Sequence, residues 1–132
     1  MKFVKVSCFL AMLVAVSLPA IAQSQQFDVP FNFYVSSKLM PAGHYRVSEV
    51  SVMDSGPWSI SGKGGSLFML TQSLESPGKV HPRSLVFWHS GGTYSLVQFW
   101  PAERNGRILP IKPEVKSTIL AGNGRYVELG AE

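Results

Sequence analysis

Residues 27–35 read FDVPFNFYV, and this stretch decides the fold class. Each odd-numbered position carries a large apolar side chain, whereas the even-numbered positions are mostly polar. Side chains of a β-strand alternate between the two faces of a sheet, so the pattern predicts a strand with one buried face. Pro30 has no backbone N–H to donate, which places it at a sheet edge or in a bulge.

Glycine and proline divide the chain beyond this strand into short segments. They recur about every ten residues and separate short runs rich in β-branched and aromatic residues, which is typical of an all-β domain. The turn at residues 41–43 precedes a strand at 44–53, whose alternation slips at residues 48–49 and indicates a bulge. The glycines at 91–92 join residues 84–89 to residues 93–100 as a β-hairpin.

The segment after Pro113 departs from this pattern and favours a helix over residues 113–121. Proline stands early, Glu114 lies in the first turn and Gly122 follows the end. A hairpin about residues 123–124, with residues 118–120 as a strand, is the alternative. We therefore predict an all-β fold, a small single-domain antiparallel β-barrel or sandwich of seven to eight short strands, with one short helix near the C-terminus. The expected inward-facing side chains are Phe31, Phe33, Tyr45, Val47, Leu67, Met69, Val86, Trp88, Leu96 and Val127.

Residues 1–22 have the three parts of a cleavable signal peptide. A basic start is followed by an apolar run, and the small-x-small pattern of residues 20–22 follows Pro19. The apolar run is shorter than the roughly 18–20 residues that span a bilayer, and no later stretch is long enough to span one. We expect residues 23–132 to form a single β domain, located in the periplasm or outside the cell and not transmembrane after cleavage.

Removal of this leader changes the chemistry that the composition allows. The leader carries two lysines and no acid, so the remaining 110 residues have a formal charge of +2 rather than +4. This charge is too small to indicate nucleic-acid binding. Cys8 is the only cysteine and is lost with the leader, which excludes disulfides, cysteine-based metal sites and a cysteine nucleophile from the mature domain.

Two blocks of the sequence resemble those of a known group of proteins. Residues 29–35 (VPFNFYV) and 39–47 (LMPAGHYRV) are similar to the VPFxFxV…LPAGxYxV signature of small exported proteins of unknown function, abundant in soil bacteria of the acidobacterial type. Residues 84–89 (SLVFWH) and 94–100 (YSLVQFW) resemble the second block of that group. Met40 replaces the usual leucine. The resemblance spans about residues 27–110 and implies no activity, cofactor or site residue.

The polar residues form no pattern that predicts catalysis or cofactor binding. The histidines at positions 44, 81 and 89 lack the two- or four-residue spacing of metal ligands on one strand or helix, and the acidic residues are dispersed singly. Residues 61–66 (SGKGGS) lack the spacing and the following helix of a phosphate-binding loop. We therefore predict no catalytic, cofactor-binding or metal-binding residues.

Aromatic and basic residues give the candidate surface for binding. An outward cluster of Tyr34, Trp58, Trp88 and Trp100 would be an exposed apolar patch, and Arg104 and Arg107 would add positive charge. The alternative is that both faces of these strands are buried and that the cations are ordinary solvated charges.

These observations favour an exported non-catalytic β-domain, a binding or accessory module of the cell envelope. Its candidate partners are an envelope glycan, a lipid or a protein. A structural or assembly protein that pairs through the edge of the strand at residues 27–35 is the alternative, and a small enzyme is less favoured.

Overall fold

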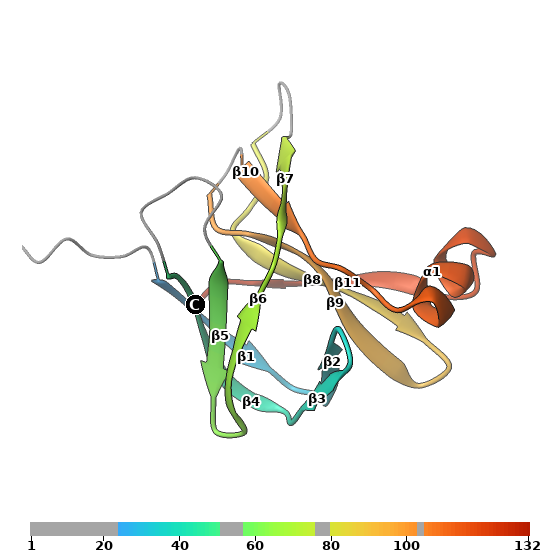
Figure 1. The fold of residues 1–132 in the computed structure, drawn as a ribbon, viewed down its shortest axis with the longest axis horizontal. Coiled ribbons are helices and arrows are strands. Elements are labelled where there is room, and N and C mark those ends of the chain that lie inside the picture. The colour runs from blue at the N-terminus through green and yellow to red at the C-terminus, as the bar shows by residue number, and fades with distance from the viewer. Residues whose placement is uncertain (1–23, 51–56, 76–79, 103–104) are drawn as a thin grey trace, which may run out of the picture.

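A computed structural model describes residues 24–50, 57–75, 80–102 and 105–132. The described residues form two β-sheets and one short helix, so the predicted all-β fold is confirmed (Figure 1). The sheets are not closed into a barrel, and the arrangement is sandwich-like. The elements are β1 (Ser24–Val29), β2 (Phe33–Val35), β3 (Lys38–Met40), β4 (Gly43–Glu49), β5 (Trp58–Gly62), β6 (Gly65–Met69), β7 (Gln72–Glu75), β8 (Ser84–Ser90), β9 (Thr93–Trp100), β10 (Asn105–Ile108), α1 (Pro113–Leu120) and β11 (Arg125–Gly130).

The eleven strands of the described residues exceed the seven to eight predicted, because short breaks divide runs that the sequence pattern joins. The stretch at residues 27–35 is the clearest case. Pro30 ends β1, and the chain resumes as β2 in the other sheet. The alternation nevertheless holds across the break, since Phe27, Val29, Phe33 and Val35 are all buried in one core.

The first sheet has the strand order β1-β4-β5-β6, and all its pairs are antiparallel. The second has the order β11-β8-β9-β10-β7, and β2 joins it by a parallel bridge between Tyr34 and Ser95. The predicted hairpin with the Gly-Gly tip is confirmed as β8 and β9, and a register shift between Val86 and Phe87 marks a bulge.

The two sheets are linked at opposite sides of the sandwich. On one side, β6 pairs with β5 whereas β7 pairs with β10, so the chain crosses from the first sheet to the second at residues 70–71. On the other side, the Glu132 N–H donates to the Gln26 carbonyl at 3.0 Å, and the Ala131 N–H donates to the Arg83 carbonyl at 2.9 Å. The backbone after β11 therefore reaches the outer edge of β1.

The main core lies between the sheets and is rich in aromatic rings. Phe33 packs edge-on against Tyr45 and Phe87, with ring centroids 5.1 and 5.3 Å apart. Most of the predicted inward-facing residues belong to this core, either buried or packed against it. Such a cluster stabilises the fold without disulfides, because each buried large apolar side chain contributes about 1.5–3 kcal/mol.

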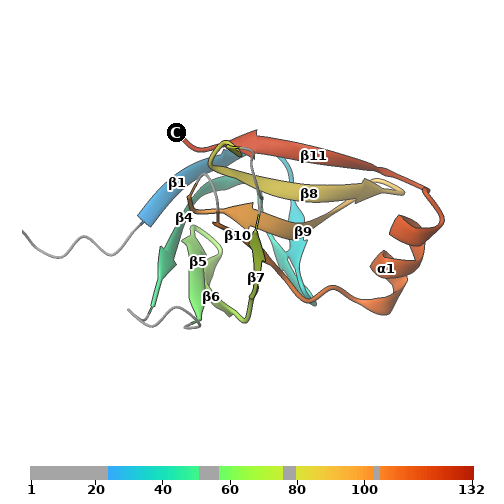
Figure 2. The same cartoon turned by 90° about the horizontal axis from the view of Figure 1, so that it is seen from above.

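Two predicted core residues, Val86 and Trp88, belong instead to a second cluster on the opposite face of β8 and β9. Leu85 and Phe87 face the main core, so alternation directs their neighbours to the other side. Helix α1 covers this second face through Val115 and Ile119 (Figure 2).

The predicted helix near the C-terminus is confirmed, and the hairpin alternative is wrong. Pro113 stands in its first turn together with Glu114. Gly122, with φ of +70°, follows the end, and the Asn123 N–H donates to the Thr118 carbonyl at 3.0 Å. This helix of eight residues is too short to cross a bilayer, and no other helix occurs in the described ranges. The predicted export signal at residues 1–22 lies outside those ranges.

Candidate functional site

The three tryptophans do not form the exposed aromatic patch that the sequence suggested. Trp58, Trp88 and Trp100 are only 3%, 5% and 4% exposed. For Trp88 and Trp100 the reason is the alternative that the sequence left open, namely that both faces of β8 and β9 are covered. Trp58 lies on β5 and is buried in the main core. The tryptophans are structural residues of the two apolar clusters.

Each tryptophan contacts a different set of neighbours. Trp58 packs edge-on against Phe99 at 5.0 Å between ring centroids. Trp88 donates its indole N–H to Thr118 Oγ1 at 2.9 Å, which ties β8 to α1. Trp100 stacks on the His81 ring at 4.0 Å. The tryptophans therefore hold separate parts of the sandwich together.

The other predicted surface residues are Tyr34, Arg104 and Arg107. Tyr34 is half-buried, and Lys112 Nζ lies 5.2 Å from the centroid of its ring. Arg107 donates to Ser73 Oγ at 3.1 Å and lies over the Trp58 ring. Arg104 lies outside the described residues. Of the predicted site residues that the structure describes, Arg107 and Trp58 are brought into contact, and Trp58 is buried. Tyr34, Trp88 and Trp100 contact other neighbours, so these residues do not form one joint aromatic and basic surface.

A different surface of the protein is both apolar and open. Phe68 and Leu70 are 69% and 76% exposed, which is far above what their size and hydrophobicity favour. They border two adjoining hollows of about 460 and 200 Å³ that share Leu70, Leu109 and Pro110. We call this surface the β6 groove; its lining consists of residues 35–38, 67–72 and 108–110.

The walls of the β6 groove come from both sheets. Strand β6 forms one wall, the turn between β2 and β3 forms the second, and the segment after β10 forms the third. Figure 1 shows β6 on the side of the first sheet that faces the β2–β3 hairpin. Of the residues that the structure describes, Lys38 is the only charged one that lines either hollow.

The backbone at this groove is also incompletely paired. Among the described residues, β6 pairs with β5 alone and β3 pairs with β2 alone. In an antiparallel pair, alternate residues direct their N–H and C=O groups away from the partner strand. The outer edge of β6 therefore presents backbone donors and acceptors beside the exposed side chains of Phe68 and Leu70.

The sequence contains a signal for this groove. Residues 67–70 read LFML, an unbroken apolar run that lacks the alternation of residues 27–35. A strand with large apolar residues on both faces is normally covered on both sides. Here Met69 is buried, whereas Phe68 remains exposed at the end of a sheet.

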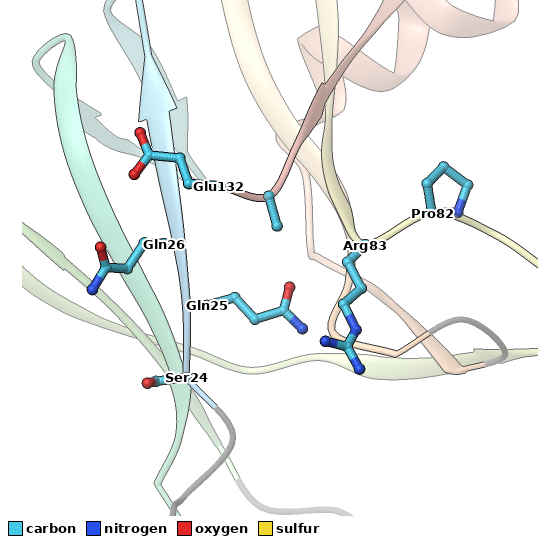
Figure 3. Close-up of a pocket in the computed structure, with 7 residues that line it drawn as sticks. Ser24, Gln25, Gln26, Pro82, Arg83 and Glu132 are labelled. Carbon is cyan, nitrogen blue, oxygen red and sulfur yellow. The ribbon is translucent and has the colours of Figure 1, made fainter.

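A larger and more polar hollow of about 860 Å³ lies at the junction of β1 with the end of the chain (Figure 3). Figure 3 shows the Gln25 and Arg83 side chains directed toward each other across it, whereas the Glu132 carboxylate points away. The Gln25 amide donates to the Pro101 carbonyl. Arg83 and Glu132, the charged residues of the described part of the chain that line this hollow, therefore do not face each other across it.

Three side chains with metal-ligating groups meet near this junction. His44 Nδ1 lies 3.7 Å from Asp28 Oδ1 and 3.6 Å from Glu132 Oε1. Spacing along one strand could not reveal this cluster, because Asp28 and His44 are cross-strand partners on β1 and β4. All three residues are exposed, and exposed acidic groups commonly gather in this way without a metal ion.

A comparison of the chain with protein-family models, curated proteins and solved structures finds no match. The function is therefore inferred from the geometry of the described residues.

Proposed function

We propose that this chain is an exported, non-catalytic binding or accessory module of the cell envelope, and that the β6 groove is its binding surface. The single observation that carries the proposal is the exposure of Phe68 and Leu70 beside two apolar hollows. Exposed apolar patches of this kind mark interaction sites in soluble proteins. The leader-like pattern of residues 1–22 supports the location in the periplasm or outside the cell.

The energetics favour coverage of this groove by a ligand. Full burial of one large apolar side chain contributes about 1.5–3 kcal/mol. Phe68 and Leu70 are 69% and 76% exposed, so covering both gives about 2–4 kcal/mol before the cost of association. The hollow around Leu109 and Pro110 adds a concave surface into which an apolar group can enter.

The polar chemistry around the groove supports binding rather than catalysis. The histidine–carboxylate contacts at His44 and His81 involve no residue that lines the groove. Among the described residues, the lining contains hydroxyl and amide groups and one lysine, but no histidine or carboxylate that would pair with a hydroxyl to activate it as a nucleophile.

The test is a ligand screen by thermal shift over glycans, lipids and peptides. The wild type is compared with the variant Phe68→Ser/Leu70→Ser and with a control, Leu120→Ser, which alters an equally exposed leucine on α1. We expect an apolar lipid or peptide to raise the melting temperature of the wild type and of the control, but not of the groove variant. The proposal would be overturned if no glycan, lipid or peptide changed the melting temperature of the wild type. It would also be overturned if a ligand raised the melting temperature of all three proteins equally.

An assembly role through a sheet edge is the second candidate, and the free edge of β6 favours it. The sequence instead predicted that the strand at residues 27–35 would pair with the sheet edge of a partner. Strand β1 does end the first sheet, but the Glu132 N–H reaches the Gln26 carbonyl on its outer side. Within the described residues, β6 is therefore the more open edge.

A further inference from the structure

We infer that the occupant of the β6 groove is an extended polypeptide segment of a partner protein, which adds to β6 as a further strand and carries an acidic residue near Lys38. The inference rests on the proposed function, because it names the partner of the same groove. It joins three features of the groove, namely its apolar lining, its unpaired strand edge and its single charge.

The strand edge distinguishes a polypeptide from other apolar ligands. An acyl chain would cover Phe68 and Leu70 but would leave the outward N–H and C=O groups of β6 without partners in a newly dehydrated groove. Burial of unpaired backbone groups is unfavourable. An extended peptide satisfies the same groups through a ladder of hydrogen bonds, and its alternate side chains enter the hollows.

The shape of the groove favours a single strand over a second copy of this chain. A Cβ atom on Gly64 would lie 2.6 Å from Pro41 Cδ, so the β5–β6 turn already touches the segment that follows β3. The β2–β3 turn forms a wall of the groove next to β6. A folded domain that brought its own sheet edge to β6 would collide with this wall. A single extended chain is narrower and needs only the space directly beside β6.

The length and charge of the groove define the segment further. Strand β6 has five residues, which corresponds to about 17 Å of paired backbone. The partner segment therefore pairs through at most about five residues, with apolar side chains at alternate positions. Lys38 is the only charge that the described residues contribute to the lining, and it lies at the β2–β3 turn, so a carboxylate at the corresponding end of the segment complements it.

The experiment uses a blocked synthetic peptide in which glutamate is followed by alternating valine and threonine. Its affinity for the purified chain is measured by calorimetry. Two analogues carry N-methyl groups, one on the valine amides and the other on the threonine amides. Alternate amides of a strand point to opposite edges, so only one analogue can disrupt pairing with β6. We expect that analogue to bind at least about tenfold more weakly and the other to bind within about threefold of the parent.

The outcomes separate this inference from the proposed function. Equal affinity of both analogues, with binding still lost in Phe68→Ser/Leu70→Ser, would overturn strand addition and leave the groove as a binding surface. The same conclusion follows if only an acyl-chain probe, dodecyl maltoside below its micellar concentration, binds in a Phe68-dependent way. Absence of binding by both probes would overturn both proposals.

The charge is tested by a swap. Lys38→Glu is expected to weaken binding of the glutamate peptide by about two- to fivefold and to strengthen binding of a lysine-bearing analogue by a similar factor. An unchanged ranking of the two peptides would overturn the assignment of an acidic residue beside Lys38.

Discussion

The contact between Trp88 and Thr118 gives a quantitative test of how α1 is held on the second sheet. The buried indole N–H donates to the threonine hydroxyl at 2.9 Å. Thr118→Val keeps the shape and β-branching of the side chain but removes the acceptor. A buried donor left without a partner costs about 1–3 kcal/mol. We therefore expect the free energy of unfolding to fall by about 1–2 kcal/mol, since Thr118 is only partly buried.

The matched control is Ser117→Ala on the exposed side of the same helix. The Ser117 hydroxyl donates only to the Pro113 carbonyl at 3.0 Å, within one turn. Its loss should change stability by less than about 0.5 kcal/mol. Urea unfolding followed by circular dichroism measures both variants, and the expected difference corresponds to roughly 4 °C per kcal/mol in melting temperature. If Thr118→Val is as stable as the control, the hydrogen bond does not hold the helix.

Three further predictions concern the core, the pH dependence and the leader. Gly106→Ala would place a Cβ atom 2.9 Å from three ring atoms of Trp100, so the free energy of unfolding in urea should fall by about 1–3 kcal/mol. In the control Gly130→Ala the added Cβ atom meets open space, and the free energy of unfolding should hardly change. Burial raises the pKa of Tyr45 above its usual value, so with rising pH the unfolded state loses the tyrosine proton before the folded state does. The free energy of unfolding should therefore fall as pH rises through about 10, and Tyr45→Phe should remove this part of the fall. A wild-type free energy of unfolding that does not change in this pH range would contradict the prediction. Secretion from a bacterial host should yield a chain that lacks residues 1–22, and an intact mass that retains them would refute cleavage.

The sequence predicted the elements of this fold better than their assignment to sheets. Alternation at residues 27–35 identified the buried face correctly, since that pattern depends only on local backbone geometry. It did not show that Pro30 ends one strand and that β2 joins the other sheet. That division depends on the pairing of β2 with β9, far away in the sequence.

The candidate site was harder to predict, for a related reason. Aromatic residues indicate a binding surface only if they are exposed, and the burial of Trp88 depends on α1, which covers it from about 30 residues away along the chain. Conversely, Phe68 belongs to an apolar run that the sequence assigned to an ordinary strand. Its exposure follows from the position of β6 at the end of the first sheet, which is a property of the whole topology.

Hydrogen–deuterium exchange of the β6 amides, with and without the strand-forming peptide, tests the central claim most directly. If the β6 groove binds an extended segment, the outward-pointing amides of Gly65–Met69 should become protected, because they gain partners on the open edge. The amides of α1 should keep their exchange rates. A peptide that binds without changing the exchange of β6, or that protects only the junction around Gln25 and Arg83, would contradict the account.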